Sequence, residues 1–248
     1  MVRSVILTKY HLASLWNWRS VYLSRLVEPV AYFVFLVAGI SGMVSNVLFA
    51  DYALYALTGI FCLLAFRTFT FTVSDVSNDR KWGVYAIFNM QGGSPKAYLL
   101  TIITVSELVF SVQVAILMLA WGVTDSVNVS GNSFIMTLRS VGIAFFIVGG
   151  WSGIGAAIGA LVDSYSTRDM ISTLTSLPIV LSAPLFYTLD SAPEYLVYIA
   201  QINPLTYHVQ WVRDADTNTL IFAIVWALVC FLIGTFALQR ADRVSTER

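Results

Sequence analysis

The sequence predicts an all-α polytopic membrane protein. Of its 248 residues, 58% are hydrophobic and only 11% are charged, and the mean hydropathy is +0.76. A soluble domain of this size carries about 25% charged residues to cover its surface, so the composition excludes one. The apolar residues also fall into runs separated by short polar segments, and each run is close to the roughly 20 residues that cross a bilayer as a helix.

These runs predict a single domain, residues 1–248, with six transmembrane helices. The expected spans cover residues 29–49, 52–74, 97–121, 134–162, 170–189 and 218–239.

Residues 1–26 are expected to form an interfacial helix that lies on the membrane before the first span. Apolar positions recur there at helical spacing, with polar residues mostly off that stripe. The segment also carries the amphipathic rings that are common at headgroup level: Tyr10, Trp16, Trp18 and Tyr22. A soluble helical arm is the alternative.

The polar segment 75–96 separates the second and third spans and contains a short helical stretch, Val84–Met90. Tyr85, Ile87 and Phe88 would give that helix an apolar anchor for a partner, and flanking charges would fix its register. An ordinary solvated loop is the alternative.

The fourth span contains small residues at close spacing: Gly149, Gly150, Ser152, Gly153, Gly155, Ala156 and Gly159. Such residues let helix backbones approach closely. We expect tight packing within the chain, with a subunit interface as the second possibility.

The stretch 170–214 begins as the fifth span and is interrupted by prolines, which mark helix starts, kinks and stops. It breaks near 189–193, resumes as the short amphipathic run Glu194–Ile202, and turns at Asn203 and Pro204. A run of about ten residues is too short to cross a bilayer. Residues 190–217 are therefore expected to form a re-entrant or outer helix hairpin, packed on neighbours or lining a cavity.

Positive charge is distributed unevenly between the two sides of the predicted topology. Arg213 is the only lysine or arginine in a loop on the far side, while Arg67 and Arg139 lie within or at the end of spans. Eleven others share the side of the N-terminus: Arg3, Lys9, Arg19, Arg25, Arg80, Lys81, Lys96, Arg168, Arg240, Arg243 and Arg248. The positive-inside rule then places both termini in the cytoplasm.

Two ionisable groups are expected at depth, Arg67 in the second span and Glu107 in the third. At about 1.5 Å per residue both lie roughly 12–15 Å from the cytoplasmic end, so they could pair. A structural ion pair is the preferred interpretation, and a substrate-facing role or proton relay is the alternative.

No catalytic or metal-binding constellation is evident. His11 and His208 are isolated, and Cys62 and Cys230 fall inside spans, where buried thiols are usually inert. The sequence has no Cys, His and carboxylate cluster with metal spacing. We therefore expect no enzymatic activity on this chain.

Three motifs in the last third carry a resemblance to a known family. They are SAPLF at 182–186, APEYL at 192–196, and NPLTY at 203–207 followed by Arg213. Together they resemble the corresponding elements of the permease subunits of type-2 ABC transporters. The segments NWR at 17–19 and Glu28 with Pro29 resemble the start of that family's first span, and look most like its drug and nodulation-factor (lipo-oligosaccharide) export branch.

The segment DRKWG at 79–83, with GGSPK at 92–96, resembles the coupling helix of that family, which sits in a groove of the ATPase subunit. The resemblance implies that the ATPase is contacted by Asp79, Arg80, Gly83, Val84, Tyr85, Phe88, Pro95 and Arg168. It likewise implies an outer gate formed by Phe186, Pro193, Leu196, Asn203, Pro204 and Tyr207.

The resemblance implies an ATP-driven exporter of an amphipathic drug-like, lipid or glycolipid substrate in a bacterial or archaeal plasma membrane. A separate ABC ATPase would bind ATP and magnesium, with no cofactor on this chain. The other expected partners are a second copy or a paralogous permease, and the bilayer; no nucleic acid is expected. The alternatives are an ATP-independent channel or secondary transporter that uses Arg67 and Glu107, and a scaffold or membrane enzyme.

Overall fold

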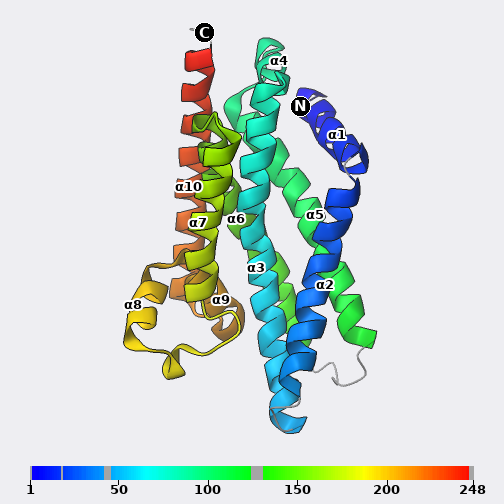
Figure 1. Ribbon diagram of the computed structural model, residues 1–248, viewed down its shortest axis with the longest axis vertical. Coiled ribbons are helices and arrows are strands. Elements are labelled where there is room, and N and C mark those ends of the chain that lie inside the picture. The colour runs from blue at the N-terminus through cyan, green and yellow to red at the C-terminus, as the bar shows by residue number, and fades with distance from the viewer. Residues whose placement is uncertain (1, 18, 42–45, 124–130, 246–248) are drawn as a thin grey trace.

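A computed structural model describes residues 2–17, 19–41, 46–123 and 131–245, and the regular elements in those ranges are all helical (Figure 1). The all-α class is thereby confirmed. The elements are α1 (Val2–Asn17), α2 (Arg19–Ser41), α3 (Asn46–Lys81), α4 (Val84–Met90), α5 (Pro95–Val123), α6 (Gly131–Leu161), α7 (Tyr165–Ser182), the 3-10 turn η1 (Leu189–Ser191), α8 (Glu194–Ile202), α9 (Pro204–Asp214) and α10 (Thr217–Ser245).

Four helices in the described part of the chain are long and apolar enough to cross a membrane. They contain the segments Tyr52–Lys81, Pro95–Gly122, Phe134–Leu161 and Thr217–Ala241. These correspond to the second, third, fourth and sixth expected spans.

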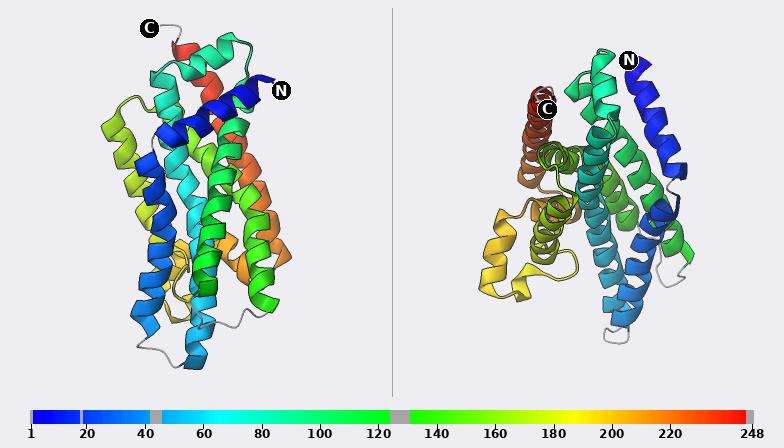
Figure 2. Two further views of the ribbon diagram at one scale, coloured as in Figure 1. Left: turned by 90° about the vertical axis from the view of Figure 1, so that its right-hand side faces the viewer. Right: turned by 45° about the horizontal axis from the view of Figure 1, so that its top comes forward.

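The long helices form one bundle around α3 (Figure 1). The side chains of Leu57, Ile60 and Phe69 on this helix are completely buried. A helix that is apolar on all sides is stable at the centre of a bundle. Both chain ends and α4 lie at one end of the molecule, while α8 and α9 lie towards the other, and the two further views agree (Figure 2).

Glycines on α6 allow its backbone to touch both α3 and α10. A Cβ on Gly153 would lie 2.3 Å from the carbonyl oxygen of Cys230 on α10, and one on Gly155 would lie 2.5 Å from that of Phe69 on α3. Both distances are shorter than any real Cβ contact. The expected tight packing within the chain is therefore confirmed.

The expected interfacial helix 1–26 corresponds to parts of two helices in the described residues. α1 covers Val2–Asn17, and residues 19–26 lie at the start of α2, the helix that continues into the first expected span. Trp18 and the side chain of Tyr22 lie outside the described residues.

Pro29 lies inside α2 without ending it. Proline has no N–H, so the carbonyl oxygen of Arg25, four residues earlier, lacks its usual helical donor. Nε2 of Gln113 on α5 donates to that oxygen at 3.0 Å. Because a neighbouring helix supplies the missing bond, the helix continues through the proline.

The segment 75–96 is more ordered than a loop. α3 continues to Lys81, and the chain then turns at Gly83, whose φ of 77° is left-handed and suits glycine. Helix α4 follows, and a second left-handed residue, Gly92, leads to α5.

The hairpin between α7 and α10 contains two helices rather than one. The fifth expected span, 170–189, is shifted: α7 begins at Tyr165 and ends at Ser182. The residues after Asn203 form α9, whose inner side chains, Leu205, Val209 and Val212, are fully buried in the main core.

Candidate functional site

Two side chains of α4 face the protein itself. Tyr85 is 4% exposed, its hydroxyl donates to the carbonyl oxygen of Leu238 on α10 at 3.1 Å, and its ring packs edge-on against Tyr98 with centroids 4.8 Å apart. Phe88 is buried beside it. These two residues hold α4 against the bundle, so the expectation that they form the free anchor for a partner is corrected.

The opposite side of this segment is exposed and apolar. Met90 is 79% exposed, Trp82 is 55% exposed and Ile87 is 50% exposed. Ile87 and Met90 are three residues apart and therefore share a face of α4. We call Ile87 and Met90, together with Trp82 in the turn before α4, the α4 face; all three side chains are exposed to a partner.

Asp79 is also an internal residue. It is 3% exposed, and its Oδ2 accepts a hydrogen bond from the hydroxyl of Tyr98 at 2.7 Å and lies 3.2 Å from Nε2 of His11 on α1. Burial alone would lower the pKa of His11, but the adjacent Asp79 carboxylate, with the charge of Asp75, outweighs burial and raises that pKa. Asp79 therefore connects α1 to the bundle and is almost entirely buried, contrary to the expectation that it contacts an ATPase.

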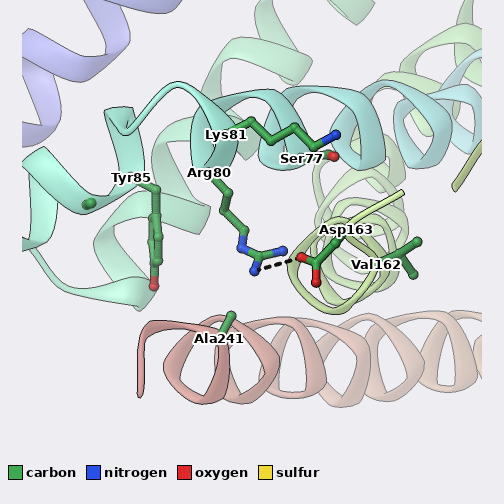
Figure 3. Close-up of a pocket in the computed structure, with 8 residues that line it drawn as sticks. Ser77, Arg80, Lys81, Tyr85, Val162, Asp163 and Ala241 are labelled. Atoms are coloured by element: carbon green, nitrogen blue, oxygen red, sulfur yellow. Dashed lines mark hydrogen bonds and ion pairs between the residues drawn. The ribbon is translucent and has the colours of Figure 1, made fainter. Parts of the chain in front are cut away.

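Arg80 joins α3 to the end of α6 at a small pocket (Figure 3). One guanidinium nitrogen donates to the carbonyl oxygen of Gly159 at 3.2 Å, and the other lies 3.4 Å from an oxygen of Asp163. The pocket holds about 160 Å³ and lies between α3, α4, α10 and the turn after α6. Arg80 thus links the end of α3 to α6 and to the α6–α7 turn.

Arg168 takes part in a second internal contact near this end. It is 9% exposed and pairs with Asp169 at 2.7 Å, and its guanidinium carbon lies 4.8 Å from the centre of the Tyr165 ring. Nζ of Lys81 lies 3.2 Å from the centre of the same ring. Tyr165 thus links α3 to α7 through cation–π contacts, and Arg168 is largely withdrawn from solvent.

The remaining residues expected at this end lie at helix starts. Gly83 precedes α4 in the left-handed conformation, Val84 packs partly against the core beside α4, and Pro95 is the first residue of α5. Proline suits that position because its missing N–H would have no helical acceptor there.

The expected ion pair between Arg67 and Glu107 does not form. Arg67 pairs with Glu28 on α2, and its guanidinium lies 5.8 Å from the centre of the Tyr32 ring. Pairing requires that two helices turn the relevant faces to each other, and Glu28 is the carboxylate that faces Arg67. Oε1 of Glu107 is buried without a hydrogen-bond partner among the described residues.

Arg213 is the main polar connection at the other end of the bundle. Its guanidinium donates to Oγ1 of Thr58 at 3.1 Å and to the carbonyl oxygens of Pro184, Tyr55 and Leu185 at 2.6, 3.0 and 2.9 Å. Its guanidinium carbon also lies 3.4 Å from the centre of the Tyr55 ring. One side chain therefore attaches the irregular segment after α7 to α3.

Asn203 connects two helix ends. Its amide nitrogen donates to the carbonyl oxygen of Ile179 at 2.7 Å and to the hydroxyl of Ser182 at 2.9 Å, at the end of α7. Its amide oxygen accepts from the backbone N–H of Leu205 at 3.0 Å, which caps α9, and Pro204 begins that helix.

The other residues of the expected outer gate are spread over this end of the molecule. Phe186 is half-buried against the main core, Pro193 is exposed before α8, and Leu196 is half-buried. The hydroxyl of Tyr207 donates to the carbonyl oxygen of Gln201, which ties α9 to α8.

A model of the family described as ABC-2 type transporter matches residues 4–216. The chain belongs to the ABC-2 type transporter family. No curated protein matches the sequence significantly. The protein is thus a multi-pass membrane subunit of an ABC transporter, a transport component that works with an ABC ATPase.

For this ABC-2 permease, the sequence indicated where the important segments lie better than which way their side chains point. The contact between His11 and Asp79 was missed because nothing in the sequence relates residues 68 positions apart. Arg213 was noticed as part of a motif, but its buried role was missed, since it was expected in a loop. The sequence feature that could have indicated it is the amphipathic run Pro204–Asp214, in which Arg213 lies eight residues after the apolar Leu205.

Proposed function

We propose that this permease is one of two membrane-spanning halves of an ATP-driven exporter, and that each half crosses the membrane six times. α2 and α7 would be the additional spans. α2 has 23 residues and α7 has 18, so at about 1.5 Å per residue they are roughly 34 Å and 27 Å long, near the thickness of the hydrocarbon core. Pro178 inside α7 is tolerated in such a helix when neighbours satisfy the freed backbone.

The end that carries α4 and both termini would face the cytoplasm. Arg3, Arg80, Lys81 and Arg240 lie on elements that reach this end, as the positive-inside rule requires (Figure 1). The irregular segment after α7, with α8 and α9, would face the outside and form the outer gate. The substrate would be an amphipathic drug-like, lipid or glycolipid molecule.

The observation that carries the proposal is the α4 face. Trp82, Ile87 and Met90 form an apolar surface at the charged end of a protein whose family works with an ATPase. Exposed apolar groups rimmed by charge are typical of protein interfaces. Because Tyr85 and Phe88 fix α4 to the bundle, a push on the α4 face would be transmitted to α5 and α10.

The alternative, an ATP-independent channel or secondary transporter, depended on Arg67 and Glu107 acting together. Arg67 instead pairs with Glu28. Because Glu28 rather than Glu107 engages Arg67, the two residues do not act as a pair and no observation favours this alternative.

The test is co-purification of ABC ATPase subunits with the tagged permease from its native membrane. Met90→Asp and Trp82→Asp should each reduce the recovered ATPase about thirtyfold, because a central interface residue contributes about 2 kcal/mol or more. Ile202→Asp is the matched control, since Ile202 is 84% exposed on α8 at the other end. Tyr85→Asp would be unsuitable, because it disrupts the permease's own packing.

Two outcomes contradict the proposal. One is that all three variants recover as much ATPase as the unmodified chain, and the other is that the unmodified chain recovers none. Permease yield and monodispersity are measured in parallel, so that a folding defect is distinguished from a lost contact.

A further inference from the structure

A lateral groove on the bundle is lined by α5, α6 and α10. It holds about 410 Å³, within the range of small-molecule sites, and its surface is almost entirely apolar. Leu108, Phe145 and Leu228 on its walls are each about half exposed or more, so the groove opens to the outside of the bundle. In a membrane-spanning segment, that direction is the lipid.

One acidic side chain, Glu107, lines this groove. Its Oε1 is buried and accepts no hydrogen bond from any residue in the described part of the chain. Two hydroxyls in the lining do not serve it, because Thr104 and Ser111 donate to carbonyl oxygens of their own helix, those of Leu100 and Glu107. The available donors of the wall are thus already used.

The cations on the lining helices do not neutralise Glu107 either. Among the described residues, Lys96 on α5, Arg139 on α6 and Arg240 on α10 make no ion pair with it, and Arg67 is engaged by Glu28. Glu107 lies 12 residues after Pro95, roughly 18 Å along α5, which is far from either end of that helix. A carboxylate at such depth is costly unless a partner compensates it, and such residues usually mark ligand or ion sites.

We propose that this groove binds a cationic amphiphile dissolved in the bilayer. Its ammonium group donates to the Glu107 carboxylate, and its apolar body lies between α5, α6 and α10. Charge complementarity selects this occupant over a neutral acyl chain, which would cover the walls but leave the carboxylate without a donor. The site is separate from the outer gate and from the α4 face, so the inference goes beyond export and does not depend on an ATPase.

Two glycines of α6 provide a matched pair of variants. Gly149 lines the groove and Gly142 does not, and a Cβ built on either meets no atom within 4 Å. Both backbone positions therefore accept a side chain without a clash at Cβ. Gly149→Leu fills the groove, whereas Gly142→Leu makes the same chemical change on the same helix two turns away.

The experiment uses the full chain in lipid nanodiscs and a photoreactive dodecylamine that carries a diazirine. Labelled peptides are identified by mass spectrometry, and dodecylamine and dodecanol are compared as competitors. We expect saturable labelling of α5, α6 or α10 that dodecylamine displaces at about tenfold lower concentration than dodecanol. Glu107→Gln should weaken amine binding about tenfold, the value of one charge-assisted hydrogen bond, and remove the difference between the competitors.

Gly149→Leu should abolish the saturable labelling, and Gly142→Leu should leave it unchanged. Equal competition by amine and alcohol, or full labelling of Glu107→Gln, would overturn the proposal and make the groove an ordinary lipid-tail contact. Efficient disulfide cross-linking of two Leu228→Cys chains would also overturn it, because a second copy would then cover the groove.

Discussion

Replacing Arg213 with methionine tests whether one buried side chain holds the segment after α7 on the bundle. Methionine keeps most of the apolar volume of the arginine stem and removes the guanidinium. The change deletes the hydrogen bonds to Thr58, Pro184, Tyr55 and Leu185 together with the contact over the Tyr55 ring.

The carbonyl oxygens that lose Arg213 as a donor determine how strongly the segment is destabilised. The carbonyl oxygen of Pro184 keeps the Tyr55 hydroxyl as a donor, and that of Tyr55 keeps the Thr58 hydroxyl. The carbonyl oxygen of Leu185 loses its charged donor. Hydrogen bonds to charged groups contribute about 1.5–3 kcal/mol each, and release of the buried charge offsets part of the loss. We expect the segment to be destabilised by about 3 kcal/mol, which is roughly a hundredfold in its opening equilibrium.

Cys62 provides the assay. It is 2% exposed on α3, one helical turn from Thr58, so a thiol reagent reaches it only when this region opens. Cys230 on α10 is buried elsewhere and serves as an internal reference. In detergent under native conditions, Arg213→Met should speed the modification of Cys62 about a hundredfold and leave that of Cys230 unchanged.

Arg213→Lys should speed the modification of Cys62 about tenfold, between the wild type and Arg213→Met. Lysine keeps the charge but cannot reproduce the planar fork of donors. Arg240→Met, at an exposed position of α10, is the matched control. An unchanged Cys62 rate in Arg213→Met would refute the reasoning. Equal acceleration at both cysteines would do so too, because it would indicate global rather than local opening.

Two further predictions concern α2 and α1. Gln113→Leu should destabilise the protein by about 1–2 kcal/mol, because it removes the hydrogen bond from Nε2 of Gln113 to the carbonyl oxygen of Arg25, and the cost should largely vanish in Pro29→Ala, where the helix supplies its own N–H. Thermal unfolding of the wild type, the two single variants and the double variant measures this, and equal costs in both backgrounds would contradict it. The raised pKa of His11 means that its contact with Asp79 stabilises the docking of α1 fully below its unfolded pKa of about 6.5 and loses that effect as pH rises through the higher folded value. Hydrogen exchange of α1 should therefore quicken with rising pH beyond its intrinsic pH dependence in the wild type but not in His11→Asn, and the same excess in both would argue against the contact.

Local sequence properties were sufficient for the class and for most of the helices. Apolar runs of spanning length reflect the thickness of a bilayer, and they predicted the segments that became α3, α5, α6 and α10. The prolines and Asn203 predicted a break after the fifth expected span, which corresponds to α7, because their backbone effects are local. The close spacing of glycines predicted the tight packing of α6.

Helix boundaries that depend on another helix could not be predicted in this way. Pro29 would normally end or kink a helix, and only Gln113 on α5 explains why α2 continues. Likewise, Asp79 is buried near the end of α3 at Lys81, and its partners Tyr98 and His11 lie on two other helices.

The sequence by itself determined that this protein is a helical membrane protein of the ABC-2 family and approximately where its segments lie. Only the tertiary structure decided that Arg67 pairs with Glu28, that Glu107 lines a separate groove, and that α4 turns Tyr85 inward. The physical reason is that adjacent residues of a helix point about 100° apart, so partners are set by the rotation of each helix against all its neighbours. The depth and polarity of a residue depend on its own segment, whereas the helix that its side chain faces depends on the whole bundle.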